Sequence, residues 1–228
     1  MKPATQQPRL ISWQTIEDIP TLSATDLHVW QIDLARYPGH PDVLDNAERT
    51  RWQRMQDPGA AQRFCATRSA LRHLLGTYLD CAPAAVSIQF GLHGKPELAN
   101  PTRSLFFNLS HTGDTAVLAC HTASPVGIDI EQSRPSSGPV RSIAERVFNP
   151  AYMATLQAAD YDPAVFLRLW VQWEAQQKCL GLGLLMRDND PSPLGFFAGE
   201  WRLGQLCVAW IRTNHQPTIK FFTLMPGI

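Results

Sequence analysis

Apolar positions along the chain form short continuous runs and stretches with a helical repeat, and turns rich in proline or glycine separate them. The run LHVWQIDL at 27–34 predicts a strand, and residues 46–55 predict a helix. Residues 59–79 predict a longer helix. Four apolar residues at helical spacing support this helix: Phe64, Leu71, Leu75 and Tyr78.

The rest of the chain shows the same mixture of elements. Short apolar runs predict strands at 86–90, 105–110, 115–121, 125–131, 205–212 and 219–224. Helical patterns cover 145–148, 152–157 and 163–180. Each half thus holds an amphipathic helix, a turn and antiparallel-looking strands, which predicts an α+β fold with two similar lobes. We expect these lobes at 1–124 and 125–228, with a loop or linker at 132–139.

Composition restricts the function classes. The 228 residues are 44% hydrophobic and 18% charged with a formal net charge of zero, which is typical of a globular protein and makes a nucleic-acid partner depend on a local patch. Five cysteines without a CxxC pair favour a reducing compartment. The sequence contains no signal peptide and no apolar run near the ~20 residues of a membrane helix. We therefore expect a cytoplasmic protein with no membrane or nucleic-acid partner.

Two carboxylates lie close together in the predicted strand 125–131. Side chains alternate along a strand, so Asp129 and Glu131 share one face while the intervening apolar residues face a core. Adjacent carboxylates repel each other unless a cation joins them, and Mg²⁺ is bound by such groups together with phosphates. Taken alone, the pattern belongs more often to a half-exposed strand with a solvated acidic face.

The predicted helix 163–180 carries a second set of polar residues. Trp170, Glu174 and Lys178 follow each other at i, i+4 and i+8 and therefore share one helix face. A carboxylate there can join a metal while the ammonium one turn away meets a phosphate. An ordinary Glu–Lys pair without catalytic meaning explains the same spacing, and taken alone it is the more frequent case.

Ser110 and His111 follow directly after the apolar residues of the strand at 105–110, where they can donate hydrogen bonds to phosphate oxygens. A serine next to a histidine also raises the alternative of a hydrolase. Adjacent residues on a strand point to opposite sides, however, and no G-x-S-x-G turn surrounds Ser110. An ordinary turn remains the other interpretation.

Arginines are concentrated between residues 46 and 73. They are Arg49, Arg51, Arg54, Arg63, Arg68 and Arg72. Guanidinium groups suit the bidentate binding of phosphate, although two solvated helix faces explain the cluster as well. Lys95 lies in the glycine-rich turn GLHGKP at 91–96.

The order and spacing of these motifs carry more information than each motif alone. GKP, FNLSHT, VGIDIE and the helix pattern W-x-x-x-E-A-x-x-K-x-x-G-x-G-L follow one another along the chain. This succession resembles the 4'-phosphopantetheinyl transferase superfamily, specifically its Sfp type. The helix RFCATRSALRHLLG also looks like the helix that precedes GKP in that family, and the likeness spans residues 45 to 185.

The resemblance implies a monomer of two lobes related by pseudo-twofold symmetry, each an antiparallel sheet with a long helix. The N-terminal lobe would form the nucleotide side of a coenzyme A site between the lobes, and the C-terminal lobe would carry the metal. The implied activity is Mg²⁺-dependent transfer of the 4'-phosphopantetheine group to a serine of an acyl or peptidyl carrier protein. Fatty-acid, polyketide and nonribosomal-peptide carriers all remain open.

The resemblance also implies roles for individual residues. Asp129, Glu131 and Glu174 would hold Mg²⁺, and Glu174, Lys178 and His111 would act in catalysis. The residues implied to bind coenzyme A are Arg51, Arg63, Lys95, Ser110, His111 and Lys178.

One position departs from the family pattern. The family reads W-x-x-K-E-A, whereas Trp173 stands here in place of the lysine. We expect its ring to pack on the apolar stripe of Phe166, Leu169 and Trp170, and Trp173→Lys to keep or raise transfer. Two alternatives stay open: a coenzyme A-binding module of the same fold with weakened catalysis, and an unrelated Mg²⁺-dependent enzyme that handles phosphates.

Overall fold

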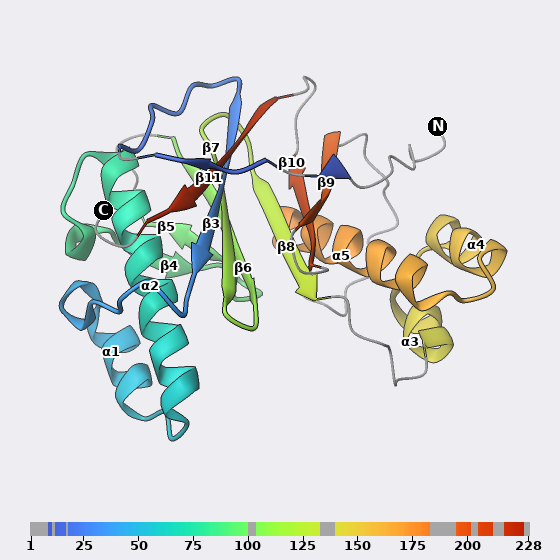
Figure 1. Cartoon of the computed structure of the whole chain (residues 1–228), viewed down its shortest axis with the longest axis horizontal. Coiled ribbons are helices and arrows are strands. Elements are labelled where there is room, and N and C mark those ends of the chain that lie inside the picture. Colours follow the sequence, from blue (N-terminus) through green and yellow to red (C-terminus); the bar gives the residue numbers. More distant parts are fainter. Residues whose placement is uncertain are drawn as a thin grey trace.

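The chain forms two main sheets, each packed against a long helix (Figure 1). A computed structural model describes residues 9–10, 12–16, 18–99, 104–132, 140–182, 195–201, 205–211 and 217–225. Its α-helices are α1 (Asn46–Gln53), α2 (Pro58–Leu79), α3 (Val140–Val147), α4 (Pro150–Ala158) and α5 (Pro163–Leu180). The α+β class predicted from the sequence is confirmed.

The strands are short and mostly antiparallel. They are β1 (Arg9–Leu10), β2 (Gln14–Thr15), β3 (Asp26–Asp33), β4 (Ile88–Phe90), β5 (Pro96–Leu98), β6 (Phe106–Thr112), β7 (Thr115–His121), β8 (Val126–Gln132), β9 (Gly195–Trp201), β10 (Gln205–Ile211) and β11 (Thr218–Leu224). One sheet has the order β2-β11-β3-β7-β6 and the other the order β1-β9-β10-β8, while β4 and β5 form a separate hairpin.

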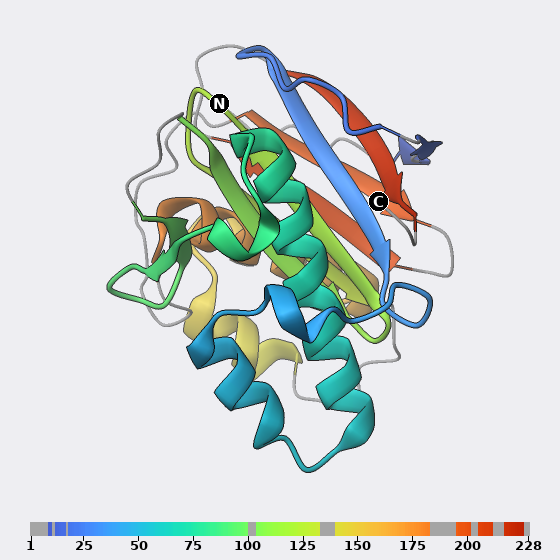
Figure 2. The ribbon, with the colours of Figure 1, turned by 90° about the vertical axis from the view of Figure 1, so that its left-hand side faces the viewer.

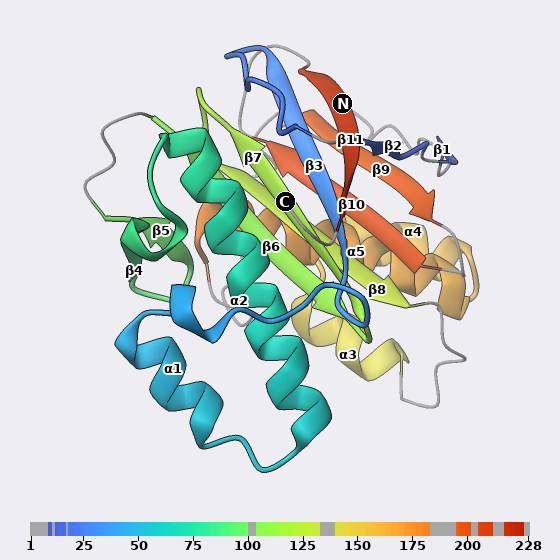
Figure 3. The same cartoon turned by 60° about the vertical axis from the view of Figure 1, so that its left-hand side comes forward.

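The end strands cross between the predicted halves. β11, which a boundary after residue 124 assigns to the second half, pairs in parallel with β3 of the first half (Figure 3). β1 pairs in parallel with β9 of the second half. The two sheets therefore do not follow the division at 124 and 125 at either end of the chain.

Local sequence signals explain where the two long helices begin and end. Asp57 caps α2 by accepting a hydrogen bond from the backbone of Gly59, and Pro58 occupies the first helical position. Asp162 caps α5 in the same way ahead of Pro163. α5 ends at Gly181, whose φ of 69° is left-handed and costs glycine little. The predicted spans of both helices are confirmed to within one residue at the start of α2.

β7 lies between β3 and β6 in its sheet and is buried on both faces. Leu118 on one face packs against α2, in a cluster that includes Leu71 and Leu74 (Figure 2). Val117 on the other face packs against Ile128 of β8. This second cluster holds the two sheets together, and it confirms that the apolar residues of β8 face a core.

The predicted linker lies outside the described residues except for Gln132, and so do residues 183–194, which follow α5. No helix in the described ranges is long and apolar enough to cross a membrane.

Candidate functional site

Close packing of α5 on β8 brings the predicted metal ligands together. Gly127 makes this approach possible, because a Cβ atom there would lie 2.0 Å from the Ala175 carbonyl oxygen and 2.3 Å from the Cys179 nitrogen. Any side chain would push the helix away from the strand. Gly127 is thus a site-forming residue whose role the sequence motif alone does not reveal.

Asp129, Glu131 and Glu174 form what we call the acidic cluster. Each offers a carboxylate oxygen, and these oxygens all lie within 4.8 Å of one another. Asp129 is almost fully buried, and the Glu174 side chain is 13% exposed. The interpretation of the strand as a solvated acidic face therefore does not describe Asp129.

The two carboxylate oxygens of Asp129 differ in their partners. Oδ1 accepts hydrogen bonds from the Ser110 hydroxyl at 2.8 Å and from the Lys178 ammonium at 2.5 Å. Oδ2 is buried and has no hydrogen-bond partner among the described residues. A buried carboxylate oxygen without a donor is costly, and a cation at this position would remove the cost.

The pKa of Glu174 also indicates an excess of negative charge in the acidic cluster. Burial and the neighbouring charge of Asp129 raise the pKa of Glu174 from 4.5 to about 7, although Lys178 acts in the opposite direction. The Lys178 ammonium lies 3.7 Å from the Glu174 carboxylate. Three carboxylate oxygens within 4.8 Å of one another are the ligand set that a divalent cation prefers.

Ser110 and His111 act on different sides of β6. Ser110 donates to Asp129, and Lys178 donates to the Ser110 hydroxyl at 3.0 Å. Desolvation and the charges of Lys178, Arg63 and Arg68 lower the pKa of His111. The pair is thus no nucleophile and base, and Ser110 serves to orient Asp129.

Asn108 is a further residue of this strand. Its side-chain oxygen accepts a hydrogen bond of 2.9 Å from the backbone of Ile128. The contact ties β6 to β8, although these strands belong to different sheets. Asn108 and Ser110 share one face of β6, so the amide sets the register that brings Ser110 to Asp129. The sequence pattern NLSH contains Asn108 but does not predict this role.

The predicted arginines lie in α1 and α2. Arg63 approaches Asp114 at 3.5 Å and Asp57 at 3.9 Å with a side chain that is 40% exposed. Such exposed pairs contribute little to stability and leave the guanidinium accessible to a ligand. The Arg51 guanidinium lies over the Phe64 ring at 5.1 Å.

Lys95 contacts the backbone of both α5 and β8. Its ammonium donates to the backbone carbonyls of Cys179 at 2.9 Å and Val126 at 3.3 Å. Burial lowers the pKa of this lysine. These hydrogen bonds of Lys95 connect the β4–β5 hairpin to α5 and β8, the two elements that carry the acidic cluster.

Trp173 packs as the sequence predicts. It is 5% exposed and lies in an apolar cluster with Phe166, Leu169 and Trp170, whose ring centroid is 5.3 Å from that of Trp173. A lysine at this position would place its ammonium in an apolar cluster. Trp173→Lys is therefore expected to cost stability, whatever its effect on transfer.

Comparison with known proteins identifies the family to which the chain belongs. Residues 125–222 match the 4'-phosphopantetheinyl transferase superfamily, and residues 28–123 match the family described as 4'-phosphopantetheinyl transferase, N-terminal. The chain belongs to the 4'-phosphopantetheinyl transferase superfamily, a superfamily of enzymes, as its motifs predict.

Individual relatives support this assignment. The 4'-phosphopantetheinyl transferase HetI from Nostoc is 33% identical over 172 residues, which cover 72% of each chain. A Synechocystis protein is 33% identical over 159 residues, or 68% of this chain and 64% of that protein. The human L-aminoadipate-semialdehyde dehydrogenase-phosphopantetheinyl transferase is 33% identical over 155 residues, or 61% of this chain and 50% of that protein. The chain thus matches between half and three quarters of the length of these relatives.

Proposed function

We propose that this protein transfers the 4'-phosphopantetheine group of coenzyme A to a serine of an acyl or peptidyl carrier protein and releases 3',5'-ADP. The observation that carries the proposal is the unpartnered Oδ2 of Asp129 within the acidic cluster, directly beside Lys178. A buried carboxylate oxygen without a hydrogen-bond donor, in a cluster of three carboxylates next to an ammonium group, suits a metal and a phosphate together. The same set argues for Mg²⁺ as the cofactor.

The acidic cluster would hold the metal through Asp129, Glu131 and Glu174. When bound, Mg²⁺ neutralises charge on the pyrophosphate of coenzyme A. Ser110 and Lys178 keep Asp129 in one orientation through its Oδ1, so that Oδ2 is the oxygen left for the metal. Oxygen ligands are those that Mg²⁺ prefers in proteins.

The reaction we propose is a displacement at phosphorus. The carrier serine oxygen forms a bond to the β-phosphorus of coenzyme A, and the bond from that phosphorus to the oxygen of 3',5'-ADP breaks. Glu174 accepts the serine proton, directly or through a water that it orients. Lys178 and His111 offset charge on the phosphates, which requires positioning more than covalent participation.

Arg51 and Arg63 would bind the nucleotide end of coenzyme A, Arg63 at the 3'-phosphate. Arg63→Ala then weakens binding of coenzyme A more than binding of dephospho-coenzyme A. The loss of a charge-assisted hydrogen bond is worth ~1.5–3 kcal/mol. Equal losses for the two ligands in calorimetric titrations would place Arg63 elsewhere.

A mass measurement tests the activity. The protein is mixed with coenzyme A, Mg²⁺ and an apo carrier protein, and transfer adds ~340 Da to the carrier, the mass of the group that coenzyme A carries. Binding of coenzyme A without this gain in mass would favour the alternative of a binding module with weakened catalysis. This alternative arises because Trp173 stands in place of the lysine of the family pattern. Neither binding nor gain would favour an unrelated phosphate-handling enzyme.

We also propose an Sfp-type monomer that works in the cytoplasm. The four cysteines whose surroundings are described, Cys65, Cys81, Cys120 and Cys179, are free thiols, which suits a reducing compartment. Acidic carrier proteins would be attracted by the arginines of α1 and α2.

A further inference from the structure

Arg68 in α2 has a buried donor that no described residue accepts. Its side chain is 13% exposed, and its Nε lies 3.6 Å from Glu48 Oε1, which is the only carboxylate that the described part of the chain places within 4 Å of it. Nη1 is buried and has no hydrogen-bond partner among the described residues. A guanidinium N–H that has lost water and gained no acceptor is destabilising. It therefore indicates where an acceptor from another molecule would lie.

A second guanidinium lies on the same aromatic ring. The Arg68 guanidinium is 5.7 Å from the centroid of Phe64, and that of Arg51 is 5.1 Å from it. Burial lowers the pKa of Arg68, and the nearby charges of Arg51 and Arg72 lower it further, whereas Glu48 raises it. Two cations held against one ring make a site for an anion, and phosphate oxygens fit the geometry of guanidinium groups.

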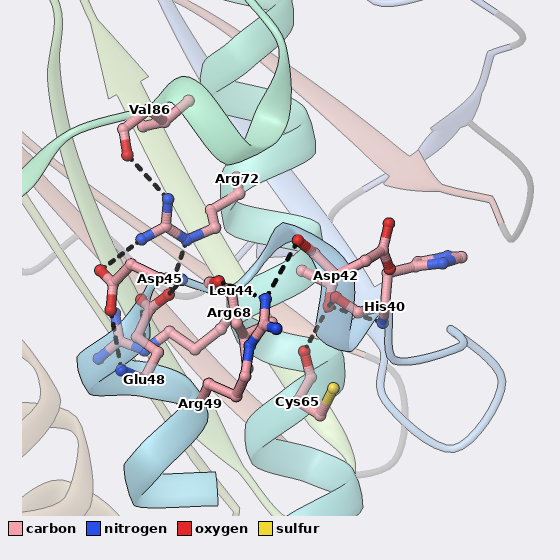
Figure 4. Close-up of polar contacts among 11 residues, drawn as sticks. His40, Asp42, Leu44, Asp45, Glu48, Arg49, Cys65, Arg68, Arg72 and Val86 are labelled. Atoms are coloured by element: carbon pink, nitrogen blue, oxygen red, sulfur yellow. Dashed lines mark hydrogen bonds and ion pairs between the residues drawn. The ribbon is translucent and has the colours of Figure 1, made fainter.

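A buried network fixes the carboxylate that orients Arg68 (Figure 4). Arg72 is fully buried and donates from Nε to Glu48 at 2.7 Å, from Nη2 to Asp45 at 2.6 Å and from Nη1 to the Val86 carbonyl at 2.7 Å. Asp45 also accepts from the backbone of Glu48 in the capping box of α1. Glu48 thus uses Oε2 for Arg72 and turns Oε1 to Arg68.

Arg68 belongs to the same part of the molecule as the acidic cluster. Its charge acts on His111 together with the charges of Arg63 and Lys178. Lys178 in turn is bound to Asp129. His111 thus lies within the electrostatic reach of cations on both α2 and α5.

We propose that Arg68 is a phosphate-binding residue whose Nη1 donates to the nucleotide end of coenzyme A, and that Glu48, held by Arg72, is the positioning residue that orients it. This inference rests on the proposed function. It adds to Arg51 and Arg63 a cation that is preorganised before the ligand arrives.

Binding measurements on Arg68→Gln test the assignment. Coenzyme A, dephospho-coenzyme A and 3',5'-ADP are titrated calorimetrically into the full chain in Mg²⁺ buffer. We expect the affinity for coenzyme A to fall at least ~10-fold, as for a lost hydrogen bond to a charged group. A loss confined to ligands with the 3'-phosphate assigns Arg68 to that group, and an equal loss with dephospho-coenzyme A assigns it to the pyrophosphate. Unchanged affinity for all three ligands would overturn the proposal.

Stability separates binding from a structural role. Because Nη1 has no described partner and Glu48 keeps its bond to Arg72, Arg68→Gln should lower the melting temperature of the free protein only slightly, and Arg68→Lys should recover part of the lost affinity. The matched control is Arg36→Gln, which removes an arginine that is 82% exposed and pairs with Asp33. A large fall in melting temperature with unchanged affinity for the ligands would show a structural role and contradict the proposal.

A double variant tests the positioning role of Glu48. Glu48→Gln should weaken coenzyme A binding, and Glu48→Gln combined with Arg68→Gln should lose no more affinity than Arg68→Gln alone. Additive losses would show that Glu48 does not act through Arg68. If the unaltered protein binds no coenzyme A, the proposed function itself fails, and this outcome is distinct from equal binding by the protein and its Arg68 variant.

Discussion

Two groups of buried charge in this molecule differ in whether their polar atoms have partners. Around Arg72, all three side-chain nitrogens donate to described acceptors, and Glu48 and Asp45 are engaged in return. In the acidic cluster, Asp129 Oδ2 has no described partner and the pKa of Glu174 is raised to about 7. The complete group joins α1 to α2 and serves the fold. The incomplete group requires a cation from outside, which is the property of a binding site.

The largest expected effect comes from breaking the complete group. Arg72→Leu leaves the half-buried Asp45 without its cation and the buried Glu48 with Arg68 alone, so the free energy of unfolding should fall by ~3–5 kcal/mol. Urea denaturation measures this loss. Arg141→Leu, which removes an exposed i,i+4 pair with Glu145, is the control and should change stability little. Equal effects of the two substitutions would show that the Arg72 network adds nothing.

Trp173→Lys should also destabilise the protein, by ~3 kcal/mol, which is the low end for removing a buried tryptophan. The reason is that the lysine ammonium would enter the cluster of Leu169, Phe148 and Tyr152. Thermal melting and transfer are measured together, with Trp173→Phe as the control that keeps an aromatic ring. A stable and more active Trp173→Lys variant would restore the interpretation of Trp173 as a tolerated loss of a catalytic lysine.

Glu174→Gln alters the incomplete group without changing its shape. Transfer to the carrier should fall ~10²-fold or more, because the variant loses both a metal ligand and the proposed base. The fold should survive, as judged by circular dichroism. Transfer within a few-fold of the unaltered protein would exclude Glu174 from both roles.

The smallest effect is a dependence of stability on pH. The folded-state pKa of Glu174 lies above its ordinary value of 4.5, so the folded protein holds more protons than the unfolded chain between about 4.5 and 7. The contribution of Glu174 to metal-free stability is therefore greatest below this window and is lost as the pH rises through it. Asp129, Glu131 and Lys178 face this carboxyl and set its pKa.

Melting curves in EDTA from pH 5 to pH 8 measure the effect. The unaltered protein should lose several °C relative to Glu174→Gln across this range, because a shift of one pKa unit is worth ~1.4 kcal/mol and ~1 kcal/mol corresponds to about 2–4 °C in a chain of this size. With Mg²⁺ present the sign reverses, because the metal binds the deprotonated carboxylate. Parallel curves for the two proteins would show that the folded protein does not raise the pKa of Glu174.

Local patterns predicted the parts of the site that lie within one element. Alternation along β8 placed Asp129 and Glu131 on one face, and helical spacing placed Glu174 one turn from Lys178. These relations follow from the periods of strand and helix alone. The convergence of the two elements follows from Gly127, whose missing side chain matters only once α5 lies on β8.

Relations between distant segments were not predictable from the sequence. β9 was missed, and β11 joins the first sheet through pairing with β3, about 190 residues earlier in the chain. The orientation of Arg68 depends on Glu48, 20 positions away in another helix. The contacts of Lys95 were not predictable either, because its motif gives no information about which carbonyl groups the fold brings to it.

Titration with Mn²⁺ tests the central claim, that the unpartnered oxygen of Asp129 in the acidic cluster marks a cation site. Electron paramagnetic resonance follows free Mn²⁺ as protein is added, for the unaltered chain and for Asp129→Asn, which keeps the shape of the side chain and its acceptor for Lys178. We predict one ion per chain for the unaltered protein, displaced by Mg²⁺, and binding at least ~10-fold weaker for Asp129→Asn. Equal binding of Mn²⁺ by both proteins, or none by either, would contradict the claim.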